Sequence, residues 1–296
     1  MKTYSEARPF IKWAGGKSQL LNAIRMKYPS SIKRYCEPFL GGGAVFFDVM
    51  AIFHPEEVLV NDINKELINS YRQLQNNCDR IVDQLKQLQS DFWDLSGNRR
   101  REMYLLSRRE YNSLRLGSSE EEDLRKAILF MFLNKTCFNG LYRVNSKGLF
   151  NVPMGAYERP LICDARNLRL CSALLQDVRI TCDDYASTAD FINHETFVYL
   201  DPPYRPISLT ASFTAYNETV FADKEQRELA GFVDIIASKG AKVVLSNSDP
   251  KNTDLFDNFF DDLYSRYAIS RVDAKRMINS KASKRGALKE LLICNF

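Results

Sequence analysis

The feature that most constrains this chain is an apolar run followed at once by an acid and two prolines. Residues 196–200, Thr-Phe-Val-Tyr-Leu, are β-branched or aromatic and apolar, and they predict a buried strand. Pro202 and Pro203 cannot donate backbone hydrogen bonds, so the chain must leave the sheet in a rigid extended turn. Asp201 and Tyr204 flank the prolines. A carboxylate, a carbonyl and an aromatic ring are therefore expected together at the carboxyl end of a strand.

The chemistry of this stretch suits a planar base that carries an exocyclic amino group. Ligands of open α/β sheets bind at the carboxyl ends of the strands. Asp201 and the Pro202 carbonyl would accept hydrogen bonds from the amino group while Tyr204 stacks on the ring. The alternative is a proline-stiffened strand exit with a surface acid, and Asp-Pro-Pro alone does not decide between the two interpretations.

A glycine loop and a spaced acid add to this prediction. Residues 35–43 end in three glycines and precede the helical pattern of residues 44–52, as in the opening of a nucleotide-binding α/β unit. The glycines let the backbone approach a ligand closely. Residues 57–62 predict a further strand that ends in Asp62, a position suited to ribose hydroxyls. A dinucleotide is not specifically indicated because the chain has no G-x-G-x-x-G in this loop.

The N-terminal stretch contains a Gly-Gly-Lys-Ser sequence before a predicted helix. A phosphate-binding P-loop would need a glycine where Ile11 stands, which makes the NTPase interpretation weak. Lys12, Trp13 and Lys17 could instead hold a small zwitterionic ligand or a nucleic-acid backbone. A tryptophan packed in the core beside solvated lysines is the alternative.

The middle of the chain differs from both ends. Residues 64–135 are helical and charged in pattern, and residues 138–153 predict a two-stranded ribbon. An aromatic ring, an amide and an arginine on a protruding ribbon could enter a DNA groove, although a structural hairpin is equally compatible. The α/β pattern then returns, with strands expected over 178–181, 242–246, 263–269 and 289–295, helices over 223–239 and 250–260, and a basic loop over 271–285.

Composition argues against several kinds of site. The net charge of +4 over 296 residues permits a nucleic-acid partner without requiring one. Seven cysteines without a C-x-x-C pair argue against disulfides or a zinc site and for a cytoplasmic protein. Only His54 and His194 are present, which argues against a histidine triad or a histidine-ligated metal. No stretch resembles a signal peptide or a membrane span.

Together these motifs resemble Dam-type DNA adenine-N6 methyltransferases, including members that read GATC, over nearly the whole chain. The matching blocks are residues 10–17, 37–43, 61–62, 138–143, 150–153 and 201–204. The resemblance implies an α/β, Rossmann-like S-adenosylmethionine-dependent methyltransferase sheet with a helical target-recognition insertion that carries a β-hairpin. It implies a discontinuous catalytic domain over residues 1–70 and 161–296 and a DNA-binding domain over residues 71–160.

The resemblance also implies an activity, a cofactor and partners. The expected reaction is methyl transfer from S-adenosylmethionine to N6 of adenine in double-stranded DNA by base flipping, with GATC as the target and S-adenosylhomocysteine as the product. We expect a monomer that uses no metal and no membrane, in the cytoplasm of a bacterium or a phage-infected bacterium.

Roles are implied residue by residue. The expected catalytic residues are Asp201, Pro202 and Tyr204. The expected cofactor-binding residues are Trp13, Ala14, Lys17, Glu37, Phe39, Gly41, Gly43, Asp62, Asp183, Asp184 and Asp201. The expected DNA-binding residues are Lys12, Phe138, Asn139, Leu141, Arg143, Asn145 and Pro153, of which Phe138 and Asn139 would form a wedge beside the flipped adenine. Ala156 and Glu158 depart from relatives that carry arginine and lysine there, which weakens the expected phosphate contacts.

Three other functions remain open at this level. One is a DNA-binding protein without turnover, although the intact Asp201 motif argues against it because binding alone needs no amino-group acceptor. Another is an amino-group methyltransferase with a different DNA site, or with a protein amide or free nucleotide as substrate. A dinucleotide-dependent oxidoreductase is disfavoured because no hydride-transfer fingerprint is visible.

Overall fold

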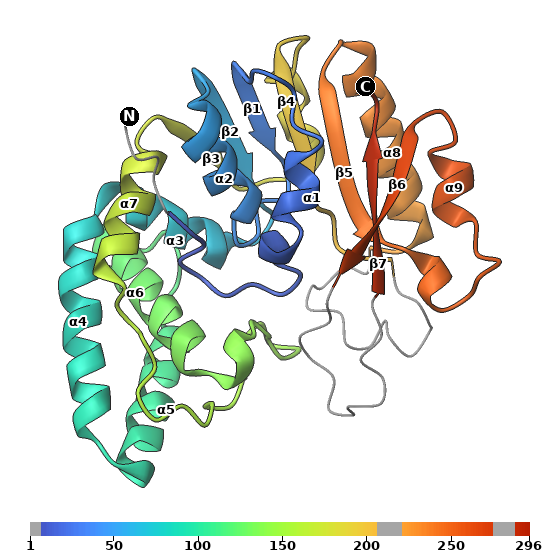
Figure 1. The fold of residues 1–296 in the computed structure, drawn as a ribbon. Coiled ribbons are helices and arrows are strands. Elements are labelled where there is room, and N and C mark those ends of the chain that lie inside the picture. The colour runs from blue at the N-terminus through green and yellow to red at the C-terminus, as the bar shows by residue number, and fades with distance from the viewer. Residues whose placement is uncertain (1–6, 206–220, 275–287) are drawn as a thin grey trace. The chain divides into compact units, whose positions relative to one another are not determined.

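A computed structural model describes residues 7–205, 221–274 and 288–296 (Figure 1). In these residues seven strands form one sheet in the order β3-β2-β1-β4-β5-β7-β6. The pairs β1–β2, β1–β4 and β4–β5 are parallel, whereas β7 runs antiparallel to β5 and β6. The strands are β1 Arg34–Glu37, β2 Glu57–Asn61, β3 Val178–Thr181, β4 Thr196–Leu200, β5 Lys242–Ser248, β6 Ala268–Ala274 and β7 Leu288–Cys294.

Helices flank the strands and make up the middle of the chain. The α-helices are α1 Leu21–Arg25, α2 Ala44–Phe53, α3 Lys65–Asn76, α4 Cys78–Asp94, α5 Gly97–Ser113, α6 Glu120–Thr136, α7 Ala165–Leu175, α8 Asp223–Ser238 and α9 Phe259–Leu263. Short 3₁₀ helices are η1 Lys17–Gln19, η2 Phe138–Gly140, η3 Tyr185–Asp190 and η5 Pro250–Asn252. The mostly parallel sheet with its helices confirms the predicted Rossmann-like class. No helix in the described ranges is long and apolar enough to cross a membrane.

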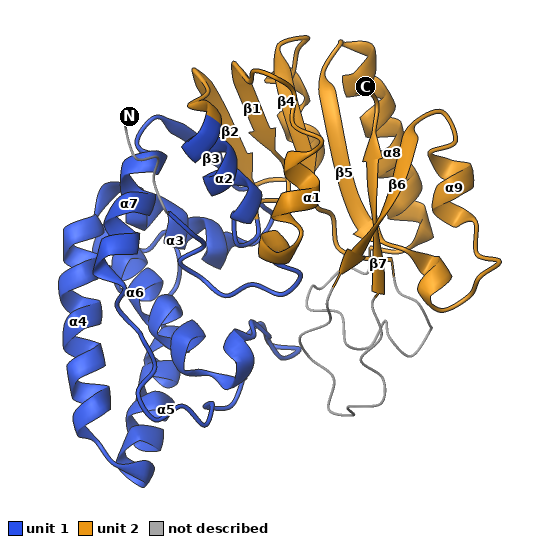
Figure 2. Ribbon diagram, viewed as in Figure 1, with its two compact units in different colours: residues 1–16, 41–52, 62–182 blue, residues 17–40, 53–61, 183–296 orange. Residues whose placement is uncertain are grey.

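The chain divides into two compact units, which Figure 2 shows in blue and orange. Unit 1 comprises residues 1–16, 41–52 and 62–182. Unit 2 comprises residues 17–40, 53–61 and 183–296. The predicted target-recognition segment, residues 71–160, lies wholly within unit 1.

The core of unit 2 explains why the central strand forms. All five residues of β4 are buried, as the apolar run predicts for a strand covered on both faces. Helix α8 presents Leu229, Val233 and Ile236 to the same buried cluster as Val198 and Leu245. Because β1, β2, β4 and β5 are parallel, their carboxyl ends meet at one edge of the sheet. That edge positions the site.

The core of unit 1 is organised around α6. This helix is buried on nearly every side and packs against α3, α4 and α5. The acidic run that opens it has a structural explanation: Ser119 accepts a hydrogen bond from the Glu122 N–H, and four acids occupy the first turn. Negative charge at a helix N-terminus is stabilised by the helix dipole.

Two predicted elements near the C-terminus are wrong. The helix expected over residues 250–260 does not form, because the Asp254 and Asp257 side chains accept hydrogen bonds from the N–H groups of Phe256 and Phe259. Such local turns replace the helical hydrogen-bond ladder. The strand expected over 263–269 is displaced, since α9 ends at Leu263 and β6 begins at Ala268.

Candidate functional site

Asp201 follows the last residue of β4, and one oxygen of its carboxylate is held by neighbouring side chains. Its Oδ1 lies 2.7 Å from the Lys17 ammonium and accepts a hydrogen bond from Ser246 Oγ at 3.0 Å. Lys17 is only 4 % exposed, so this ion pair is shielded from water. Within the described residues, Oδ2 of Asp201 has no hydrogen-bond partner. The carboxylate is therefore fixed in orientation while one oxygen stays available to a ligand.

The two prolines are held by a buried amide pair. Gln226 Nε2 of α8 donates to the Pro203 carbonyl at 3.1 Å, and Asn247 Nδ2 of β5 donates to Gln226 Oε1 at 3.2 Å. Both amide side chains are completely buried. In the part of the chain that the structure describes, no donor reaches the Pro202 carbonyl. Pro202 O is thus a second acceptor available beside Asp201.

Tyr204 is anchored by its hydroxyl. The Tyr204 hydroxyl accepts from Lys17 Nζ at 2.8 Å and donates to Glu290 Oε2 of β7 at 2.7 Å. The Lys17 ammonium also lies 4.8 Å from the centre of the Tyr204 ring. The tyrosine nevertheless remains 36 % exposed. Unit 2 therefore brings the predicted Asp201, Tyr204 and Lys17 together and adds Glu290, which sequence reasoning missed.

The end of β1 carries another buried acid. Glu37 is buried and accepts a hydrogen bond from the Tyr35 hydroxyl at 2.6 Å. Burial, together with the Glu37 charge, raises the pKa of Tyr35. Phe39 follows and packs its ring against Tyr185 and Phe221, with ring centres 5.2 and 6.1 Å apart respectively.

Asn61, the last residue of β2, holds the backbone of Asp183 at the edge where the parallel strands end, and Asp184 follows. The Asn61 side chain donates to Asp183 O at 2.9 Å and accepts from Asp183 N at 3.1 Å. Asp184 is exposed and accepts from Ala186 N at 2.9 Å, which caps η3. The exposed Asp183 side chain accepts from Asp184 N at 2.7 Å. Both acids therefore shape a loop, and both remain accessible to solvent.

In unit 1, Asp62 and the glycine loop are joined. Asp62 Oδ2 accepts from Gly41 N and Oδ1 accepts from Asn64 N, each at 2.9 Å. Burial raises the pKa of Asp62, and these N–H donors oppose that effect. Gly41 and Gly43 both have positive φ, 49° and 70°, which favours glycine.

Trp13 contacts the glycine loop and Tyr142 within unit 1. A Cβ added to Gly41 would come within 3.0 Å of the Trp13 indole, so the loop approaches the ring as closely as a glycine allows. The indole also stacks on Tyr142, with ring centres 5.6 Å apart and planes inclined by 23°. Ala14 follows and is exposed.

The predicted wedge stands on a tight turn. Phe138 is 51 % exposed, and the exposed Asn139 has a positive φ of 54°. Asn134 of α6 accepts from Lys12 N at 2.8 Å and donates to the Lys12 and Gly140 carbonyls at 2.8 and 3.0 Å. The buried Asn134 side chain therefore holds the backbone of both Lys12 and the turn that carries the predicted wedge. Unlike the predicted ribbon, this segment begins as the short helix η2.

The predicted ribbon itself is short. Val144 and Phe150 form the bridge between its arms, and Asn145 accepts from Lys147 N and Leu149 N in the turn. Arg143 is exposed and donates from Nε to Asn151 Oδ1 at 2.7 Å, which orients its guanidinium. Leu141 is half-buried, and Pro153 is exposed while its carbonyl accepts from Phe138 N at 2.9 Å.

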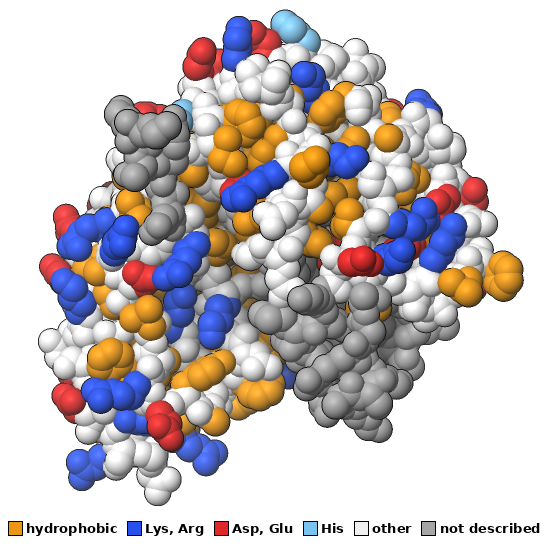
Figure 3. All heavy atoms as spheres, in the orientation of Figure 1, with side chains coloured by type: hydrophobic (Ala, Val, Ile, Leu, Met, Phe, Trp, Pro, Cys, Tyr) orange, Lys and Arg blue, Asp and Glu red, His pale blue; other side chains and the backbone are white. Residues whose placement is uncertain are grey.

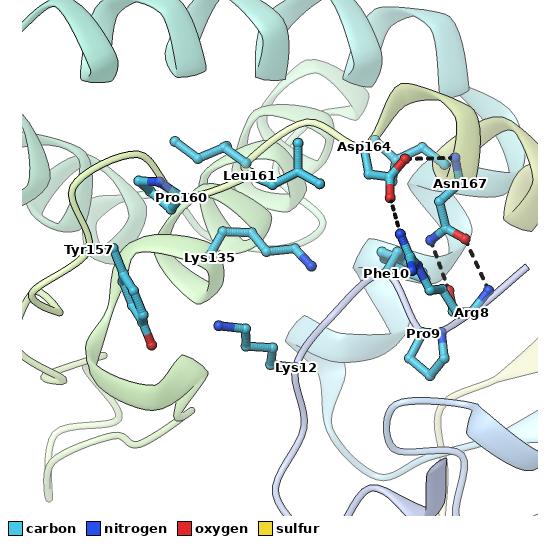
Figure 4. A pocket seen from close by; sticks show the side chains of 12 residues that line it. Arg8, Pro9, Phe10, Lys12, Lys135, Tyr157, Pro160, Leu161, Asp164 and Asn167 are labelled. Carbon is cyan, nitrogen blue, oxygen red and sulfur yellow. Dashed lines mark hydrogen bonds and ion pairs between the residues drawn. The ribbon is translucent and has the colours of Figure 1, made fainter. Parts of the chain in front are cut away.

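A basic hollow lies beside Lys12 in unit 1. Its volume is about 300 Å³, and Lys12, Lys135 and Tyr157 point into it (Figure 4). Arg8 and Asp164 also line it and form an ion pair of 2.8 Å. Burial, with the nearby charges of Lys12 and Arg8, lowers the pKa of Lys135 to about 8. The sequence pattern alone had not singled out Lys135, because a lysine within a charged helical stretch usually lies on a solvated face.

Figure 3 shows further Lys and Arg side chains on the displayed face of unit 1. Most of the basic loop expected over residues 271–285, including Lys284, lies outside the described residues. Arg271 lies within β6 and is bound to Asp249 and Asp261 at 2.9 and 2.7 Å. Among the described residues, no cluster of three or more His, Cys, Asp or Glu side chains could hold a metal.

Comparison with known proteins shows the family to which this chain belongs. A family model for D12 class N6 adenine-specific DNA methyltransferases matches residues 13–278. The chain belongs to this family. It is 42 % identical over 297 residues to the Type II methyltransferase M.MjaIII of Methanocaldococcus jannaschii, covering 98 % of this chain and 100 % of the relative.

Two bacterial relatives extend the match. The Type II methyltransferase M1.LlaDCHI of Lactococcus lactis is 35 % identical, with coverage of 98 % of this chain and 95 % of the relative. The DNA adenine methylase of Haemophilus influenzae is 32 % identical, with coverage of 99 % and 95 %. The protein is therefore an adenine-specific DNA methyltransferase, as its sequence motifs predict, and DNA is its class of substrate.

Proposed function

We propose that this methyltransferase moves the methyl group of S-adenosylmethionine to N6 of an adenine rotated out of duplex DNA, at the sequence GATC. One observation carries the catalytic part of the proposal. Asp201 is fixed through Oδ1, while its Oδ2 and the neighbouring Pro202 carbonyl have no donor within the described residues. Two acceptors side by side match the two hydrogens of an adenine amino group.

These acceptors address the central difficulty of the reaction. The lone pair of the adenine amino nitrogen is conjugated with the ring, so the nitrogen is a poor nucleophile. Hydrogen bonds to Asp201 Oδ2 and Pro202 O favour a tetrahedral nitrogen, whose lone pair then projects from the ring. When bound, S-adenosylmethionine supplies an electrophilic methyl group on its sulfonium. Holding both reactants in line can lower the activation free energy by about 7–11 kcal/mol. Asp201 Oδ2 accepts the proton that N6 releases.

The residues present fit that cofactor. In unit 1, a side chain at Gly41 would crowd the Trp13 indole, so the glycine keeps the loop close to the ring. Asp62 is half-buried, and its hydrogen bond from Gly41 N fixes an orientation that suits ribose hydroxyls. In unit 2, Asp183 and Asp184 are exposed and offer further acceptors to the adenine group of the cofactor.

Replacement of Asp62 should weaken the binding of S-adenosylmethionine. Asp62→Ala removes both a ribose acceptor and the carboxylate that holds Gly41 N, so we expect a loss of about 1.5–3 kcal/mol in isothermal titration calorimetry. Asp94→Ala, an exposed acid of α4 in the same unit, is the control. Unchanged affinity in a folded Asp62→Ala protein would show that the ribose lies elsewhere.

Base rotation is supported by the turn at Phe138. Extrusion of a base costs a few kcal/mol, and protein groups that replace its stacking lower that cost. Phe138 offers an exposed ring and Asn139 an exposed amide, at the point where Asn134 holds the backbone. A ring can fill the vacated stack, and an amide can pair with the orphaned thymine.

Lys135 should make DNA binding dependent on pH. With a pKa lowered to about 8, the ammonium is charged below that pH and becomes neutral above it. If it contacts a phosphate, raising the pH from 7 to 9 should weaken duplex binding by about 1 kcal/mol, or roughly five-fold in Kd. Lys135→Arg should abolish this pH dependence because arginine stays charged. Fluorescence anisotropy measures the Kd of the wild type and of Lys135→Arg at each pH. The same dependence of Kd on pH in both proteins would contradict a phosphate contact of Lys135.

The proposed function is tested with tritiated S-adenosylmethionine and short duplexes. We expect label in a duplex that contains GATC, no label where GATC is disrupted by one base, and N6-methyladenine as the modified nucleoside after digestion. Label in every duplex would exclude GATC as the specific target. Label in protein or free nucleotide but not in DNA would refute the proposed substrate.

A further inference from the structure

We infer that Glu290 of β7 is a positioning residue for catalysis: through the Tyr204 hydroxyl it fixes the aromatic ring on which the extruded adenine stacks, an inference that rests on the function proposed above. Glu290 is distant in sequence from the Asp201 motif and belongs to none of the motifs that identify the family from sequence. It reaches the site only because β7 inserts between β5 and β6, where Glu290 is paired with Ser248 and Val272.

The geometry of Tyr204 shows why an anchor is needed. Its side chain follows two prolines, is 36 % exposed and ends in a hydroxyl that forms two hydrogen bonds. Lys17 donates to that hydroxyl at 2.8 Å, and the hydroxyl donates to Glu290 at 2.7 Å. The donor and acceptor functions of the phenol are both used, so the far end of the ring is fixed while one part stays open to a ligand. A carboxylate acceptor makes this hydrogen bond strong.

Glu290 also takes part in the charge balance of the site. The Lys17 ammonium lies 2.7 Å from Asp201 and 3.9 Å from Glu290, so one buried cation lies between two carboxylates. Burial raises the pKa of Glu290, and the Asp201 charge adds to that effect while Lys17 and Tyr204 oppose it. An acid whose folded pKa is raised stabilises the fold only at low pH and loses that contribution as the pH rises. A gain in stability at high pH therefore does not explain the burial of this acid.

This role gives a specific pattern of variant activities. Single-turnover methylation by Glu290→Ala should fall by roughly 10- to 100-fold because a displaced ring misplaces the adenine. Affinity for DNA and cofactor should remain within about two-fold. Glu290→Gln keeps an acceptor for the phenol and should recover to within about three-fold of wild type. Tyr204→Phe removes the hydrogen bonds to both Glu290 and Lys17, so it should be at least as slow as Glu290→Ala. The double variant should be no slower than Tyr204→Phe, since the Tyr204–Glu290 hydrogen bond is already lost in each single variant.

Two further measurements separate positioning from a structural role. Fluorescence of 2-aminopurine at the target base should report looser stacking in Glu290→Ala and near wild-type stacking in Glu290→Gln. The melting temperature of Glu290→Gln should not fall, because a neutral amide avoids the cost of a buried carboxylate. If Glu290→Ala does not fold, Tyr204→Phe and Glu290→Gln decide the question: a slow Tyr204→Phe with a nearly normal Glu290→Gln supports the inference.

Several results would overturn it. They are a wild-type rate in Glu290→Ala or in Tyr204→Phe, a Glu290→Gln as slow as the alanine variant, or multiplicative effects in the double variant. The wild-type protein assayed in parallel keeps the two proposals apart. Failure of wild type to methylate adenine refutes the proposed function, whereas a normal wild-type rate with unaffected variants refutes only the role of Glu290.

Discussion

Asp201→Ala should lower single-turnover methylation by roughly 10³-fold while the protein still binds DNA and cofactor. The reason is that Oδ2, the oxygen without a partner in the described residues, acts mainly in the transition state. Quench-flow with excess enzyme measures the methylation step, and calorimetry measures the two binding steps. Comparable turnover in the variant would refute the mechanism.

Asp201→Asn is the informative companion variant. The amide retains the shape of the carboxylate and leaves one oxygen for Lys17 and Ser246. Its nitrogen then faces the adenine amino group as a second donor, so we expect activity nearly as low as that of the alanine variant. Asp190→Ala, an exposed acid of η3 in the same unit, should keep the wild-type rate. An active Asp201→Asn would indicate that shape alone suffices.

The second large effect is expected at Arg143. Its guanidinium is exposed on the hairpin and oriented by Asn151, as a side chain that reads a base edge should be. Arg143→Ala should cost about 1–3 kcal/mol on GATC and relax discrimination at one base pair. The measurement is methylation of GATC and of each single-base variant of it. Asn151→Ala should relax the same position more weakly because the arginine loses its orientation.

Lys147 is the matched control on the same hairpin. It is exposed at the turn, where Asn145 organises the backbone rather than the lysine side chain. If the lysine contacts a phosphate, Lys147→Ala should weaken binding to every duplex equally. It should also reduce the slope of log Kd against log salt concentration by about one. If Arg143→Ala instead lowers the methylation of all duplexes by the same factor, the arginine only contacts a phosphate. The GATC proposal then loses its main support.

Local patterns predicted the parts of this fold that local physics decides. The strand over residues 196–200 is correct because a short continuous apolar and β-branched run followed by prolines is typical of a buried strand. Residues 223–239 form a helix to within one residue for a similar reason, since their apolar positions recur at helical spacing. The expected helix over 250–260 fails because aspartate side chains compete for the backbone N–H groups, an outcome that propensity alone does not settle.

Short motifs with rigid backbone chemistry were enough to predict the family, the Rossmann-like class and the residues at the exit of β4. The tertiary structure alone decided that Lys17 is bound between Asp201 and Tyr204, that Glu290 anchors Tyr204, and that Lys135 is half-buried beside Lys12. These contacts join residues far apart in the chain, up to 187 positions in the case of Lys17 and Tyr204. No local pattern encodes them, because they depend on which strands become neighbours in the sheet and on how much water is excluded there.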